Sequence, residues 1–252
     1  MRDDQWVRRF HPPRQNRARL VCFPHAGGSA SFFFPVSKAL SPALDVLAIQ
    51  YPGRQDRRLE PGITSIAELA DQATEALRSH LDRPLILFGH SMGAIVAFEV
   101  ARRLERDGDG RVIDLFVSGR RAPSRHQDEN VHLRDDEGIV AELKLMSGTD
   151  AALLGDDEIL RMILPAIRSD YTAIETYRCE PGATVSCPIT VLVGEADPRT
   201  SPDEASAWND HTTGLFELHT YAGGHFFLAH HQPEITNLIR AHSISTVSGR
   251  PR

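Results

Sequence analysis

The pentapeptide Gly89-His90-Ser91-Met92-Gly93 has the spacing G-x-S-x-G, in which the central serine acts as a nucleophile in many hydrolytic enzymes. It follows the apolar run 85–88 and precedes a stretch with helical periodicity, so we expect it at a strand-to-helix turn. Such a turn needs glycine where two backbones approach too closely for a Cβ, and its strain raises the serine hydroxyl clear of the sheet. These residues therefore predict nucleophilic chemistry at Ser91.

A serine hydroxyl needs a base to take its proton and an acid to orient that base. Asp197 follows the apolar run 191–193, and His225 follows the expected strand 216–221. Because catalytic groups of open α/β sheets gather at the carboxyl ends of the strands, we expect Ser91, Asp197 and His225 to form a catalytic triad. Taken alone, Asp197 also suits an ordinary turn before proline. The order Ser, Asp, His is that of α/β-hydrolases.

The reaction of such a serine passes through an oxyanion, which backbone N–H groups stabilise by about 3 kcal/mol each. One donor is the residue after the nucleophile, here Met92. The other comes from the loop after an early strand, and we assign it to Ala26 in the segment 24–28.

The sequence indicates neither a cofactor nor a metal. It contains no G-x-x-x-x-G-K-[ST] and no G-x-G-x-x-G, the two glycine patterns that cradle phosphates. Its histidines lack the spacing of a zinc site. We therefore expect no cofactor-binding residues and no metal ligands.

The elements that must position these residues alternate between strand and helix. Strands are expected at 19–23, 45–49, 85–88, 112–117, 188–193 and 216–221, and helices at 65–81, 92–107, near 202 and at 233–241. This rhythm predicts an α/β fold, with a mostly parallel central sheet flanked by helices.

The segment 122–178 interrupts that rhythm. It carries candidate helices at 137–146, 156–167 and 170–177 with no strand between them. We interpret it as a helical lid inserted over the sheet; a separate small helical domain is the alternative. With 252 residues, 41% of them apolar, the chain fits one α/β domain over 18–242, preceded by an extension at 1–17 and followed by a flexible tail at 243–252.

The charge balance and the apolar runs argue against nucleic acid and membranes as partners. A net charge of −6 gives no reason to expect nucleic acid or an anionic membrane surface. The short arginine groups are predicted to be solvated surface; they lie at Arg54/Arg57/Arg58, Arg102/Arg103/Arg106 and Arg120/Arg121. No signal peptide and no membrane-length apolar run is evident, so we expect a cytoplasmic protein, and nothing demands more than a monomer.

Together and in order, five stretches resemble the type II thioesterases that accompany polyketide synthases and non-ribosomal peptide synthetases. They are 22–30, 51–57, 88–94, 194–198 and 223–228, with His25-Ala26-Gly27-Gly28 and Tyr51-Pro52-Gly53-Arg54 the most particular. The resemblance implies an α/β-hydrolase with a helical lid. It also implies that the enzyme removes stalled acyl units from the phosphopantetheine arm of an acylated carrier protein; composition and spacing alone indicate no such substrate.

Other readings of the same residues remain open. The triad would equally serve a carboxylesterase or lipase acting on free esters, or an acyltransferase, and a non-catalytic binding protein with this fold is a further alternative. In the lid, apolar residues are candidates for an acyl channel, although packing alone also explains them: Leu143, Leu145, Met146, Leu153, Leu154, Ile163 and Leu164.

Overall fold

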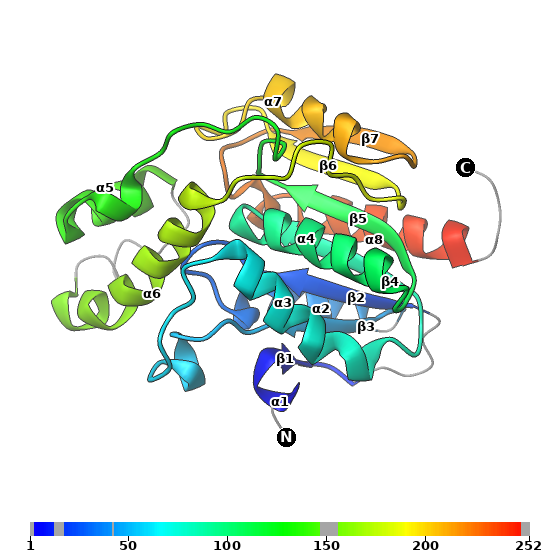
Figure 1. The fold of residues 1–252 in the computed structure, drawn as a ribbon, viewed down its shortest axis with the longest axis horizontal. Coiled ribbons are helices and arrows are strands. Elements are labelled where there is room, and N and C mark those ends of the chain that lie inside the picture. Colours follow the sequence, from blue (N-terminus) through cyan, green and yellow to red (C-terminus); the bar gives the residue numbers. More distant parts are fainter. Residues whose placement is uncertain (1–2, 13–17, 42, 147–155, 248–252) are drawn as a thin grey trace.

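The computed structural model describes residues 3–12, 18–41, 43–146 and 156–247 and forms a sheet of the order β1-β3-β2-β4-β5-β6-β7 (Figure 1). Its strands are β1 (Val7–Arg8), β2 (Arg19–Phe23), β3 (Asp45–Ile49), β4 (Leu85–His90), β5 (Val112–Ser118), β6 (Ile189–Gly194) and β7 (Phe216–Tyr221). Strands β2 to β7 pair in parallel, and β1 pairs antiparallel with β3 at one edge. The parallel α/β sheet predicted from the sequence is confirmed.

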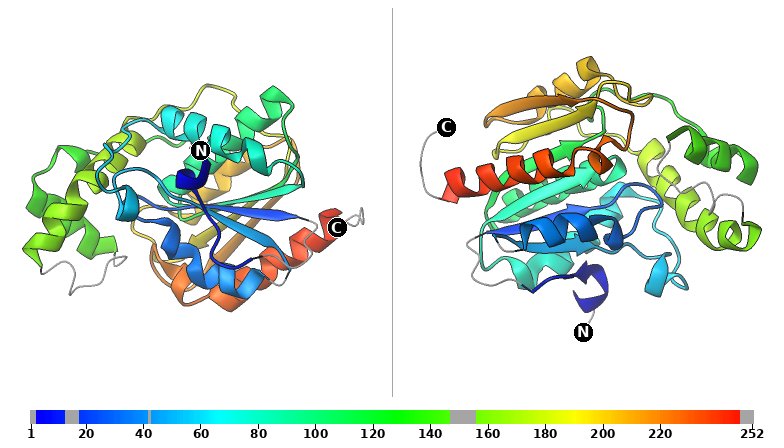
Figure 2. Two further views of the ribbon diagram at one scale, coloured as in Figure 1. Left: turned by 90° about the horizontal axis from the view of Figure 1, so that it is seen from below. Right: turned by 180° about the vertical axis from the view of Figure 1, so that it is seen from behind.

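Helices cover both faces of the sheet (Figure 2). Alternate residues of β2 point to opposite sides: Leu20 and Cys22 belong to one apolar cluster, and Val21 and Phe23 to the other. The first cluster includes residues of α2 (Phe34–Leu40) and α8 (Gln232–Val247), and the second includes residues of α3 (Ile66–Leu77) and α4 (Met92–Asp107). Burial on both faces explains why these strands read as continuous apolar runs.

Local signals mark the start of α3 and the end of α4, two helices that pack against each other. Ser65 caps α3 by accepting the N–H of Glu68, and α4 ends at Gly108 in the left-handed conformation with φ 68°. The short helices α1 (Asp3–Trp6) and α7 (Pro202–Ser206) complete the set outside the insertion, together with α2, which the sequence analysis did not identify. The starts of α3 and α4 agree with the sequence to within one residue.

The segment between β5 and β6 carries α5 (Asp136–Met146) and α6 (Asp157–Thr176), which lie beyond the carboxyl ends of the strands (Figure 1). The prediction of two helices at 156–167 and 170–177 was wrong, because α6 continues through both. Ser169 does not start a new helix; its hydroxyl donates back to the carbonyl of Pro165 at 2.9 Å. Asp170 directs its carboxylate to distant residues instead of capping a helix.

The structure describes parts of both segments expected at the ends of the domain. At the start, the expected extension 1–17 is part of the domain where the structure describes it: Trp6 is buried in the core and Val7 pairs with Ile49 of β3. At the end, the tail expected from 243 is helical as far as Val247, because α8 is held by His242, whose ring lies 2.7 Å from the buried carboxylate of Asp114. Residues 13–17 and 248–252 lie outside the described residues.

Within the described ranges, none of the helices has both the length and the apolar character that crossing a membrane requires.

Candidate active site

Ser91 lies at a strained turn between β4 and α4. Its backbone has φ 55° and ψ −120°, a conformation that residues other than glycine rarely adopt. The two glycines of the motif make the turn possible: a Cβ on Gly89 would lie 2.1 Å from the carbonyl oxygen of Gly93, and one on Gly93 would lie 2.0 Å from that of Phe23. The turn therefore places the Ser91 hydroxyl at the carboxyl edge of the sheet, at the start of α4.

The structure brings His225 and Asp197 into direct contact. The Nδ1 atom of His225 lies 2.8 Å from Oδ2 of Asp197, and both side chains are buried. Because an ionised carboxylate only accepts hydrogen bonds, Nδ1 carries the proton and Nε2 is left as the basic nitrogen. The loops that carry the two residues are joined by backbone bonds, in which Glu195 donates to Tyr221 and Ala196 donates to Gly223.

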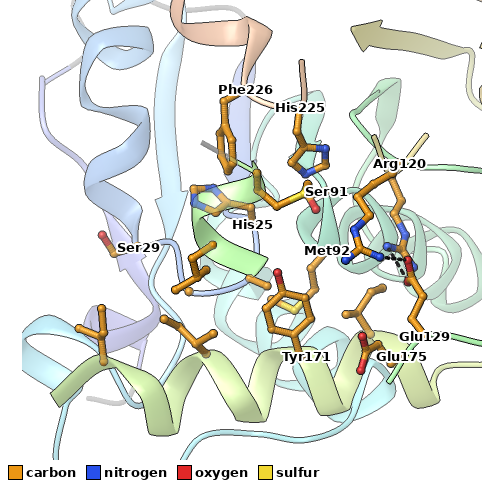
Figure 3. A pocket seen from close by; sticks show the side chains of 18 of the residues that line it. His25, Ser29, Ser91, Met92, Arg120, Glu129, Tyr171, Glu175, His225 and Phe226 are labelled. Carbon is orange, nitrogen blue, oxygen red and sulfur yellow. Dashed lines mark hydrogen bonds and ion pairs between the residues drawn. The ribbon is translucent and has the colours of Figure 1, made fainter. Parts of the chain in front are cut away.

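Ser91 and His225 line the same cavity, which has a volume of about 350 Å³. Figure 3 shows Ser91 just below the His225 ring, with α6 crossing the lower part of the view. Met92 and Ala26, the two residues predicted to donate to an oxyanion, also line this cavity. All five sequence-predicted site residues are thus gathered at one place, with Asp197 behind His225.

One wall of the cavity is apolar and comes from the inserted helices. Its residues are Leu143 and Met146 of α5 and Ile163, Ile167 and Ile174 of α6. Of the channel residues proposed from the sequence, three line the cavity, Leu145 is 62% exposed, and Leu164 is buried but does not line it. Leu153 and Leu154 lie outside the described residues.

Another part of the cavity wall is polar, which the sequence analysis missed. Glu129 accepts hydrogen bonds from Arg121 at 3.2 Å and from Arg199 at 3.0 Å, while the nearest atom of Arg120 lies 3.8 Å away. The Nε atom of Arg120 is buried without a hydrogen-bond partner, and burial lowers the pKa of this guanidinium to about 10. The predicted solvation of Arg120 and Arg121 was wrong; their position directly after β5, at a strand end, was the available signal.

On the α6 side of this wall, Tyr171 and Glu175 point from the helix toward the cavity (Figure 3). Glu175 is held by the backbone N–H groups of Val131 and His132, each at 3.0 Å, and by the His132 ring at 2.5 Å. Its charge is therefore satisfied by the segment before α5.

Two further histidines surround the His225 ring. The ring centroids of His90 and His225 are 5.1 Å apart, and His25 lies 5.9 Å from His90. Burial, followed by the charge of His225, lowers the pKa of both: to about 3 for His25 and well below its usual range for His90. Both rings are neutral at physiological pH, so they add no positive charge against a protonated His225.

The sequence of this chain matches a family of known proteins and several of its members. Residues 18–242 match the family described as the thioesterase domain. A probable cadicidin biosynthesis thioesterase from Streptomyces griseus is 56% identical over 227 residues, and the match covers 90% of this chain but 63% of that protein. The thioesterase PikA5 from Streptomyces venezuelae is 50% identical over 242 residues, covering 96% of this chain and 86% of the relative.

Solved structures of type II thioesterases are also similar to this chain. The type II thioesterase BorB from the borrelidin biosynthetic cluster has a TM-score of 0.89 and 51% identity, and the match covers 95% of this chain and 98% of BorB. YbtT, the type II thioesterase from the yersiniabactin pathway, has a TM-score of 0.87 and 30% identity, covering 96% of this chain and 99% of YbtT.

Proposed function

We infer the function of this chain from the premise that it belongs to the thioesterase domain family, whose match spans residues 18–242. The chain is a type II thioesterase, a serine hydrolase that cleaves acyl thioesters in polyketide or non-ribosomal peptide biosynthesis. One observation carries the mechanism: the strained turn presents Ser91 to the cavity in which His225, bonded to Asp197 at 2.8 Å, exposes its basic nitrogen.

The first half of the reaction forms an acyl-enzyme. Nε2 of His225 takes the proton of the Ser91 hydroxyl while the serine oxygen attacks the thioester carbonyl, and the C=O becomes a tetrahedral oxyanion. The N–H groups of Met92 and Ala26 stabilise this charge. The C–S bond then breaks, and the thiol leaves with the proton that His225 holds.

The second half restores the enzyme. A water molecule gives its proton to Nε2 of His225 and attacks the acyl-serine carbonyl; the tetrahedral intermediate collapses, the serine regains its proton and the acid leaves. Asp197 stays ionised throughout and stabilises the imidazolium that forms in each half.

The substrate proposed is an acyl group on the phosphopantetheine thiol of a carrier protein. Three features support it: the apolar wall of the cavity suits an acyl chain, the volume of about 350 Å³ suits a short to medium one, and the relatives come from polyketide and peptide pathways. In this role the enzyme removes stalled or aberrant acyl units from the assembly line.

The test is incubation of the purified protein with a panel of acylated carrier proteins, followed by intact mass measurement. We expect deacylation by the wild type and a loss of at least about 1000-fold for Ser91→Ala. Ser29→Ala is the matched control, because Ser29 lines the same cavity outside the turn, and it should retain activity within about threefold.

Two results would contradict the proposal. A higher kcat/KM on a matched nitrophenyl ester than on the carrier thioester would favour a carboxylesterase. Transfer of the acyl group to an added alcohol or amine in preference to water would favour an acyltransferase.

A further inference from the structure

Asp170 is a fully buried carboxylate in the middle of α6, and its hydrogen bonds lead away from the helix. Oδ2 accepts the backbone N–H of Gly27 at 2.7 Å and Nη1 of Arg54 at 2.7 Å, and Oδ1 accepts Nη2 of Arg54 at 2.9 Å. A carboxylate and a guanidinium in this two-bonded arrangement have a well-defined relative orientation. Asp170 thus joins the inserted helix to two separate loops of the domain.

Arg54 holds the same loop from its other side. Its Nη1 also donates to the carbonyl of Gly28 at 3.0 Å, while Nε and Nη2 donate to the carbonyl of Pro52 at 3.1 and 3.0 Å. The Arg54 side chain is only 7% exposed, so these bonds form away from competing water. Together Arg54 and Asp170 bind the N–H of Gly27 and the C=O of Gly28, two consecutive residues of one loop.

That loop is the one that carries the proposed oxyanion donor, because Gly27 directly follows Ala26. The N–H of Gly27 is bound to Asp170 and is therefore not available to an oxyanion. Ala26, the residue before it, lines the cavity. The loop also packs against α6 itself: Gly27 has φ +75°, and a Cβ there would lie 2.8 Å from Cγ1 of Ile167, one turn before Asp170. The loop conformation is therefore set by contacts with α6.

We propose that Asp170, acting with Arg54, is a positioning residue that fixes the oxyanion loop so that the Ala26 N–H faces the reacting carbonyl. The inference rests on the proposed function, since it assigns a part in that reaction to a residue outside the triad. Displacing a catalytic group by about 1 Å costs on the order of 100-fold in rate, so a residue that acts only through geometry has a large effect.

In this arrangement α6 has two roles: it lines the cavity, and it positions the loop that carries the oxyanion donor. Ala173 and Ile174, which follow Asp170, belong to the main apolar cluster of the domain. A lid movement that leaves this half of α6 in place preserves the oxyanion loop, whereas one that displaces Asp170 dismantles it.

The test uses two variants. The double variant Arg54→Met/Asp170→Leu removes the ion pair without leaving a lone buried charge, and Asp170→Asn weakens the pair. Two ligands report the result. One is an alkyl boronic acid, which forms a tetrahedral adduct with the serine and needs the oxyanion donors. The other is an S-alkyl pantetheine thioether, which lacks the carbonyl and cannot react. In both variants we expect boronate affinity and kcat to fall together, by about 10- to 100-fold, with thioether affinity and KM within twofold of wild type.

Asp114→Asn is the matched control. Like Asp170, Asp114 is a fully buried carboxylate, but it lies on β5, contacts His242 at 2.7 Å and does not line the cavity. It should lower the melting temperature and leave the ratio of boronate to thioether affinity unchanged. The proposal is overturned if Asp170→Asn leaves the ratio of boronate to thioether affinity unchanged, whether neither affinity falls or both fall equally. If the double variant does not fold, the result for Asp170→Asn decides. Failure of wild-type thioester hydrolysis refutes the proposed function separately, because the two affinities are measured without turnover.

Discussion

Nδ1 of His225 lies 2.8 Å from Oδ2 of Asp197, and the Asp197 carboxylate is fully buried behind the ring. The contact joins two loops at the ends of neighbouring strands β6 and β7, and it assigns the proton to Nδ1.

Asp197→Asn should therefore leave the fold intact and lower kcat by about 10³ to 10⁴, because the amide favours the wrong tautomer of His225. KM should change by less than threefold, since Asp197 is not among the residues that line the cavity. Steady-state kinetics on an acyl-pantetheine thioester measure both values. Activity within tenfold of wild type would remove Asp197 from the triad.

Gly93→Ala should abolish folding or reduce stability by more than about 4 kcal/mol, because the new Cβ would lie 2.0 Å from the backbone oxygen of Phe23. Gly108→Ala is the matched control: its φ is also positive, at +68°, but nothing lies within 4 Å of the added Cβ. It should cost about 1 kcal/mol. Urea unfolding monitored by circular dichroism compares the two, and similar losses would refute the close-approach argument.

The stability of the protein should fall as the pH is lowered below about 6.5, partly through His25. Burial, then the charges of His225 and Arg54, lowers the pKa of His25 from 6.5 to about 3 in the folded state. Between these values the unfolded chain binds a proton that the folded state does not, so the contribution is complete above pH 6.5 and lost toward pH 3. One such group changes stability by up to about 1.4 kcal/mol per pH unit.

His25→Phe should accordingly give a shallower dependence of the unfolding free energy on pH between 6 and 4.5, since phenylalanine keeps the ring contacts with Phe32 and Phe226 but cannot bind a proton. Some slope should remain, because His90 has a pKa lowered in the same direction. Chemical denaturation at a series of pH values tests this. An identical slope in the variant would show that His25 does not titrate on unfolding.

Arg120→Met should shift acyl selectivity toward longer apolar chains, because it removes a guanidinium from the cavity wall whose Nε has no hydrogen-bond partner. The ratio of kcat/KM for octanoyl over acetyl pantetheine should rise by about tenfold, with stability within about 1 kcal/mol of wild type, since Glu129 keeps its bonds to Arg121 and Arg199.

Arg121→Met is the corresponding control. Arg121 is buried and donates to Glu129 and to the carbonyl of Arg199, but it does not line the cavity. This variant should lose about 2 kcal/mol of stability without the change in selectivity. The same selectivity in both variants would refute the role of Arg120 in the cavity wall.

The sequence by itself determined the features that depend on local pattern. The strands, the glycine-bounded turn at Ser91 and the positions of Asp197 and His225 after strands are readable, because each depends on neighbouring residues and on the rule that parallel strands end at one edge. The approximate extent of the inserted helical segment was also readable, from the absence of strand patterns. These signals were sufficient to predict the fold and the gathering of the site residues.

The tertiary structure decided what depends on contacts between distant residues. Arg54 reads as a solvated surface charge in the sequence and is buried because Asp170, 116 residues away, accepts its hydrogen bonds. The same partnership lets α6 continue through Asp170, where the sequence indicated a break, and the contact between His242 and Asp114 holds α8 beyond its expected end. Propensity describes a residue among its neighbours, whereas the cost of burying a charge is offset only by the partner that folding brings to it.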